Sequence, residues 1–138
     1  MTLVDTNVLL DLVTNDPIWA DWSVRQLNVA AVRGALAVNG VIYAELSVRF
    51  ARIEDLEAML EESGIVVRAI PRAALFLAGK AFQRYRALGG QRRGVLPDFF
   101  IGAHAAVAGL ALLTRDTGRY RGYFPSVDLI VPESRRGP

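Results

Sequence analysis

The sequence predicts a three-layer α/β/α sandwich around a central, mostly parallel sheet. Short apolar runs of three to five residues alternate along the chain with longer segments of helical periodicity. Strands that are apolar throughout are typical of parallel strands covered by helices on both faces. The length of 138 residues suits one domain and no repeat or linker divides it, so we expect a single domain over residues 1–138.

The first half of the chain is expected to contribute three strands and four helices. Asp16 and Pro17 are typical of a helix start, Asn39 can cap another helix, and Gly64 can end one. The predicted strands are 2–4, 36–38 and 65–69, and the predicted helices are 7–13, 17–32, 41–52 and 54–63.

The second half continues the alternation. A loop over 89–97 carries Arg92 and Arg93, and Asp98 stands at the start of the helix that follows. The predicted helices are 71–88 and 98–108, and the predicted strands are 110–114 and 129–131. The pattern leaves the order of the strands open.

Composition excludes several kinds of site. The chain has no cysteine, which excludes disulfides, thiolate nucleophiles and cysteine-ligated zinc, and one histidine, which excludes a multi-histidine metal site. No serine lies in a glycine-flanked elbow and no phosphate-binding G-x-x-x-x-G-K loop occurs. No apolar stretch is long enough for a bilayer and no signal-peptide pattern is present, so we expect a cytoplasmic protein without membrane contact.

The two halves of the chain carry opposite charge. Residues 1–67 hold ten acids and four arginines, whereas residues 68–138 hold twelve bases and four acids. Fifteen of the sixteen bases are arginine, whose planar guanidinium suits phosphate oxygens. The asymmetry favours a phosphate polyanion as ligand, and ordinary surface charge on an arginine-rich chain is the alternative explanation.

Two aspartates follow predicted strands. Asp5 comes directly after strand 2–4, and Asp116 stands two residues past strand 110–114. Ligands of parallel sheets bind beyond the carboxyl ends of the strands, so the two carboxylates would meet if these strands are neighbours. Alternatively, Asp5 caps the next helix and Asp116 begins a turn.

Two further acids lie on largely apolar helix faces. Glu45 shares its face with Val41, Ile42 and Val48, and Asp98 with Ile101, Gly102 and Ala105. A cation, a hydrogen bond or protonation must offset the desolvation of such a carboxylate. The alternatives are a salt bridge from Glu45 to Arg49 and an N-cap role for Asp98. His104 also lies among apolar neighbours, which favours a packed, hydrogen-bonded histidine over a general base.

Together the four acids suggest one carboxylate pocket. Four carboxylates do not remain ionised at close range without a cation, and oxygen ligands favour Mg²⁺ or Mn²⁺. A metal-dependent phosphatase is one alternative. It usually needs a second aspartate where this chain has Asn7 and a lysine near the phosphate, whereas the single lysine, Lys80, lies mid-helix. A non-catalytic metal- or RNA-binding subunit of a regulatory complex is another.

Four segments resemble the signature blocks of PIN-domain nucleases, in particular VapC-type toxins of toxin–antitoxin pairs. They are LVDTNVLLDL (3–12), VIYAEL (41–46), LPDFFIGAHA (96–105) and LLTRDTGRYRGYFP (112–125). The resemblance places the family's acids at Asp5, Glu45, Asp98 and Asp116, and its polar positions at Asn7 and Thr114. Some members carry a further acid where this chain has Gly102 or Thr117, which leaves the number of metal ions open.

The resemblance implies a PIN-like fold and metal-dependent hydrolysis of RNA. Mg²⁺ would be held by Asp5, Asp98 and Asp116, and Glu45 would orient or deprotonate the attacking water. Substrate contacts are expected at Asn7, Thr114, Arg92, Arg93 and Arg115, with Arg119 and Arg121 also near the RNA backbone.

The expected partners besides RNA are a cognate antitoxin protein and a second copy of the chain in a homodimer. The helix 17–32 has Ala20, Val24, Leu27 and Ala31 as a core stripe, while Ile18, Trp19, Trp22 and Val29 project from the opposite face. Two tryptophans on such a face indicate an anchor for a protein partner. Burial of that face under a neighbouring helix is the alternative.

Overall fold

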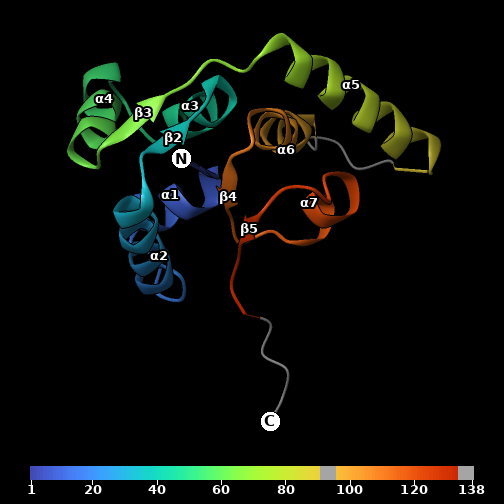
Figure 1. Ribbon diagram of the computed structural model, residues 1–138. Coiled ribbons are helices and arrows are strands. Elements are labelled where there is room, and N and C mark those ends of the chain that lie inside the picture. The colour runs from blue at the N-terminus through green and yellow to red at the C-terminus, as the bar shows by residue number, and fades with distance from the viewer. Residues whose placement is uncertain (91–95, 134–138) are drawn as a thin grey trace.

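The computed structural model describes residues 1–90 and 96–133 and contains a five-stranded, wholly parallel sheet. The strands follow the order β3-β2-β1-β4-β5, so β1 is central (Figure 1). Their bounds are β1 Thr2–Val4, β2 Leu36–Val38, β3 Ile65–Val67, β4 Ala111–Leu113 and β5 Leu129–Ile130. The predicted fold class is confirmed, and each strand lies inside its predicted range.

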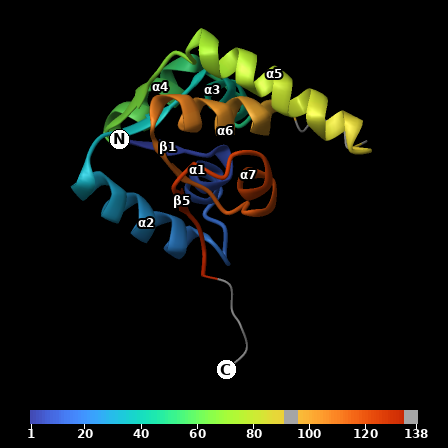
Figure 2. The ribbon, with the colours of Figure 1, turned by 45° about the vertical axis from the view of Figure 1, so that its right-hand side comes forward.

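The described residues form seven helices around this sheet. They are α1 Thr6–Val13, α2 Ala20–Arg33, α3 Gly40–Ser47, α4 Ile53–Glu62, α5 Arg72–Ala87, α6 Leu96–Ala108 and α7 Gly118–Tyr123. In Figure 2, which labels β1, α2 lies on one side of this strand and the pair α5 and α6 on the other. None of these described helices has the length and apolar character needed to cross a membrane.

Several helix boundaries differ from the prediction, and a side-chain hydrogen bond explains one of them. Helix α2 begins at Ala20 instead of residue 17. Asp16 caps the turn that precedes α2, because its Oδ1 accepts hydrogen bonds from the backbone N–H groups of Ile18 and Trp19, each at 2.9 Å. Helix α3 ends at Ser47, whose Oγ donates to the carbonyl of Ala44 at 2.6 Å. The prediction had continued it to residue 52. Helix α6 begins at Leu96 instead of residue 98.

The buried stripe of α2 is rotated relative to the predicted one. Ala20 and Leu27 are buried as expected, but Val24 is 42% exposed and Ala31 is also exposed, and the other two buried positions are Ser23 and Ala30. Polar pairing explains the rotation, because Ser23 Oγ donates to the buried Asp11 Oδ2 at 2.7 Å. Apolar periodicity alone could not place a buried serine on the core face.

Candidate active site

The four acids gather at one edge of the sheet. Strand β1 pairs in parallel with β4, with Val4 opposite Leu113, so Asp5 and Asp116 follow neighbouring strand ends as the sequence predicted. Together with Glu45 of α3 and Asp98 of α6 they line one cavity of about 230 Å³. The other residues that line it are Thr6, Asn7 and Leu10.

Asp5 is held on both oxygens. Its Oδ1 accepts from the backbone N–H of Thr6 at 2.7 Å, which makes it the N-cap of α1. Its Oδ2 accepts from the hydroxyls of Thr114 at 2.7 Å and Tyr120 at 3.0 Å. Burial raises the pKa of Asp5, while these hydrogen bonds act against the rise and the charge of Glu45 adds to it. The two alternatives given for Asp5 are therefore both correct: it caps helix α1 and its carboxylate lines the cavity.

A polar network links the ends of β1 and β4. Besides donating to Asp5, Thr114 Oγ1 accepts from the backbone N–H of Asp116 at 3.0 Å and from Asn7 Nδ2 at 3.4 Å. Asn7 Oδ1 in turn accepts from the backbone N–H of Arg115 at 3.2 Å. Asn7 and Thr114 thus fix the loop that carries Asp116, in addition to lying beside the cavity.

Glu45 is half-buried and is anchored by a hydroxyl. Thr6 Oγ1 donates to Glu45 Oε1 at 2.6 Å. Among the residues that the structure describes, Glu45 forms no salt bridge, so the proposed pairing with Arg49 is absent. The reason is that α3 ends at Ser47, before the turn that would bring Arg49 onto the same face.

Asp98 lies in the first turn of α6 and forms an ion pair with Arg119 of α7. Its pKa is raised to about 6, mainly by burial and also by the charges of Asp5 and Asp116, against a lowering influence of Arg119. We expected Arg119 near the RNA backbone. The structure instead turns its guanidinium inward to a pocket acid.

Arg115 is also paired within the protein. Its Nε and Nη2 donate to Asp11 Oδ2 and Oδ1 at 2.8 and 2.9 Å, and its guanidinium lies 5.0 Å from the ring centroid of Trp19. About a quarter of the side chain is exposed (27%), so contact with a substrate stays a prediction. Arg92 and Arg93 lie outside the described residues.

His104 is a packed residue, as expected. It is 2% exposed, and its Nδ1 lies 3.1 Å from Nδ2 of Asn39, the residue that caps α3. Burial lowers the pKa of His104, which favours the neutral imidazole. His104 therefore belongs to the core and does not line the carboxylate cavity.

The chain matches a known family over most of its length. The family model described as PIN domain matches residues 2–124. The chain belongs to the PIN domain family. No curated protein sequence matches it.

Solved structures share the fold of this PIN domain. VapBC2 from Rickettsia felis bound to a promoter DNA fragment is 18% identical with a TM-score of 0.70, covering 94% of this chain and 97% of that chain. DNA-bound VapBC from Salmonella typhimurium is 19% identical with a TM-score of 0.67, covering 95% and 98%. FitAcB from Neisseria gonorrhoeae is 20% identical with a TM-score of 0.66, covering 94% and 96%.

The donors of this PIN domain fit a hard divalent cation in type and charge. All four acids present oxygen, and the raised pKa values of Asp5 and Asp98 reflect burial and mutual repulsion that a cation would relieve. In the described part of the chain, no three carboxylate or imidazole groups converge as a preformed metal site. Asp98 is engaged by Arg119, and Asp5 by hydroxyl and N–H donors, so binding requires side chains to turn.

The sequence placed Thr6 near the metal ligands or phosphate and Arg119 near the RNA backbone, but it did not predict that Thr6 contacts Glu45, Tyr120 contacts Asp5 and Arg119 contacts Asp98. Tyr120 and Arg119 both come from α7, a helix of six residues that the sequence did not predict. A helix this short contains too few residues for helical periodicity to be visible.

The missing further acid has a steric explanation. A Cβ on Gly102 would lie 2.3 Å from Cδ2 of Phe124, closer than atoms approach in a packed core. The position of Gly102 in α6 is therefore filled by the Phe124 ring, with no room for a carboxylate.

Proposed function

We propose that the chain, as one domain over residues 1–138, is a Mg²⁺-dependent endoribonuclease and the toxin of a type II toxin–antitoxin pair in the cytoplasm. The observation that carries this proposal is the set of four acids around one cavity of a PIN domain. Fold neighbours described as toxin–antitoxin complexes support the biological role. Mn²⁺ would serve in place of Mg²⁺ because its oxygen ligands are the same.

The polar residues of the cavity would have different roles in the hydrolysis. Asp5, Asp98 and Asp116 would hold the cation, whose charge polarises the phosphoryl group when it is bound. Thr6 holds Oε1 of Glu45, and Oε2 would orient the attacking water and accept its proton. Thr114 and Tyr120 donate to Oδ2 of Asp5, which lowers the pKa of Asp5 against the rise caused by burial.

The decisive experiment compares two substrates. The protein is incubated with single-stranded RNA and with a generic phosphomonoester, each with Mg²⁺ and with EDTA. Cleavage of RNA within the strand, dependent on Mg²⁺, supports the proposal. Release of phosphate from the monoester alone would favour a phosphatase, and activity on neither would favour a non-catalytic subunit.

Arg92 and Arg93 are proposed to contact the RNA backbone. Replacing both with alanine should weaken RNA binding and flatten its salt dependence, since each lost phosphate contact removes roughly 0.7 from the log–log slope for single strands. The measurement is fluorescence anisotropy with labelled RNA at several salt concentrations, using a cleavage-deficient Asp98→Asn background. If the slope is unchanged, RNA binds to a surface that does not include Arg92 and Arg93.

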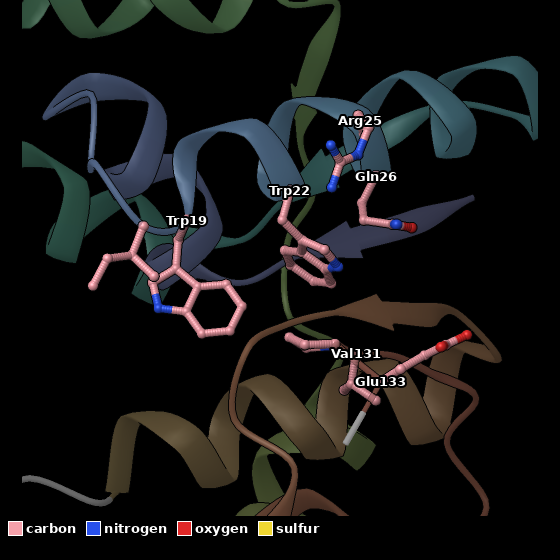
Figure 3. A pocket seen from close by; sticks show the side chains of 8 residues that line it. Trp19, Trp22, Arg25, Gln26, Val131 and Glu133 are labelled. Atoms are coloured by element: carbon pink, nitrogen blue, oxygen red, sulfur yellow. The ribbon is translucent and has the colours of Figure 1, made fainter. Parts of the chain in front are cut away.

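The antitoxin is proposed to bind a groove beside α2. Ile18, Trp19 and Trp22 form one wall, and Val131 to Glu133 from the segment after β5 form the other (Figure 3). The tryptophan rings pack edge to face with centroids 6.0 Å apart, both are half-buried, and Ile18 is 77% exposed. Large apolar side chains at a concave exposed surface are typical anchors for a partner chain.

Ile18 offers a test that spares the packed tryptophans. We expect Ile18→Ser to weaken antitoxin binding about tenfold or more, since burying a large apolar side chain is worth about 1.5–3 kcal/mol. RNA cleavage by free toxin should stay unchanged. The matched control is Val32→Ser in α2, which removes an apolar side chain that is 89% exposed but does not line the groove. Equal antitoxin affinity for parent, Ile18→Ser and Val32→Ser, measured by calorimetry, would place the partner elsewhere.

A further inference from the structure

Arg119 is a largely buried cation beside the carboxylate cavity. Its Nη1 donates to Oδ2 of Asp98, and the two side chains are only 14% and 28% exposed. The guanidinium also lies 6.0 Å from the ring centroid of Tyr85, which packs against Phe99 and Tyr123. The Tyr85 ring and the Asp98 carboxylate together hold the Arg119 guanidinium against the cavity instead of in solvent.

The position of Arg119 bears on the charge balance of the cavity. A guanidinium does not lose its proton in a protein, so a metal ion can take the place of Arg119 at Asp98 only if the arginine side chain moves. Asp98 Oδ2 faces Arg119 as long as the pair exists, and it is one of the oxygens that a metal ion needs. A divalent cation and Arg119 therefore compete for the same carboxylate.

We propose that Arg119 acts as an internal counter-cation that holds Asp98 when metal is absent and must be displaced for metal to bind. This inference rests on the proposed function, because it assumes that the four acids bind a divalent ion. A competing internal cation lowers the apparent metal affinity by the fraction of molecules in which the pair is open. It also stabilises the metal-free protein, since it neutralises one of several buried negative charges.

The test is Mn²⁺ binding by isothermal titration calorimetry to the parent, Arg119→Gln and Arg121→Gln. Arg121 lies on the same helix and is exposed, so it is a matched control for the loss of one positive charge. We expect Arg119→Gln to lower the Kd for Mn²⁺ about tenfold and Arg121→Gln to change it less than about twofold. In EDTA the Tm of Arg119→Gln should fall below that of the parent. Addition of Mn²⁺ should raise the Tm of Arg119→Gln by more than it raises the Tm of the parent.

A second measurement does not depend on the variant's folding. In the parent protein, the Arg119 Nε–Hε signal in a nitrogen-15 NMR spectrum should shift in step with saturation by Mg²⁺, while that of Arg121 should not. Arg119→Lys assigns the signal, and by keeping the positive charge it should leave the Mn²⁺ Kd within about threefold of the parent.

The outcomes separate the inference from the proposed function. The inference is overturned, while the metal site stands, if the parent binds Mn²⁺ and Arg119→Gln binds it no more tightly. It is also overturned if the Arg119 Nε–Hε signal does not shift when Mg²⁺ is added to a parent protein that binds Mn²⁺. If neither parent nor variant binds Mn²⁺, the metal site itself is wrong and the inference falls with it.

Discussion

Replacing Asp98 with asparagine is expected to reduce RNA cleavage by at least about 100-fold, because it removes a proposed metal ligand, and even the residues behind such ligands cost 10–100-fold. The fold should survive, since asparagine keeps an oxygen that accepts from Arg119. The measurement is the initial rate of cleavage at saturating Mg²⁺. The control is Asp128→Asn, the same change at an exposed position outside the cavity, which should retain full activity. Undiminished cleavage by Asp98→Asn would remove this residue from the active site.

The same variant should alter the pH dependence of stability without metal. Burial and neighbouring charges raise the pKa of Asp98 to about 6, so between about pH 4 and 6 the folded protein binds more protons at this site than the unfolded chain. The free energy of unfolding should therefore fall as the pH rises through that range. Asp98→Asn has no such proton, so in EDTA its curve should be flatter and its stability at pH 7 equal to or above that of the parent. A curve as steep as the parent's would show that other groups cause the dependence.

Replacing Arg115 with methionine is expected to destabilise the fold by about 3 kcal/mol or more, the usual cost of breaking a buried ion pair from one side. The variant would leave Asp11, which is 2% exposed, as a charge without its two guanidinium hydrogen bonds. The midpoint of urea unfolding at unchanged m-value measures the effect. Arg121→Met, at an exposed position of α7, should stay within about 0.5 kcal/mol of the parent.

A double variant distinguishes charge from packing. Adding Asp11→Asn to Arg115→Met removes the isolated charge while keeping an acceptor for Ser23 Oγ, so it should recover part of the lost stability. If Arg115→Met instead unfolds at the same urea concentration as the parent but binds RNA more weakly, the original assignment of Arg115 as a substrate contact is the better one.

The acids could be located from sequence because of where they stand relative to buried segments. Asp5 and Asp116 follow short apolar strands, and parallel strands bring their carboxyl ends to one edge whatever else the chain does. Glu45 was visible as a charge on an apolar helix face. These signals depend on local spacing and on one general property of parallel sheets, so they needed no knowledge of the strand order.

The partners of those acids could not be located in the same way. Arg115 and Arg119 stand in one arginine-rich stretch and look alike in sequence, yet one pairs with Asp11 and the other with Asp98. Arg119 reaches Asp98, 21 residues away in the chain, from the short helix α7, whereas Arg115 reaches Asp11 across 104 residues. The same holds for Ser23, whose burial is explained by a hydrogen bond to Asp11 and not by its own character.

The hydrogen bonds that hold Asp5 also have a consequence for synthesis of the protein. They join positions 109 and 115 residues apart, from Thr114 and Tyr120 back to Asp5, directly after the first strand. A growing chain therefore exposes Asp5 early, but the donors that fix it emerge from the ribosome only after most of the domain has been translated. The complete hydrogen-bond network around Asp5 therefore forms only after Thr114 and Tyr120 have left the ribosome.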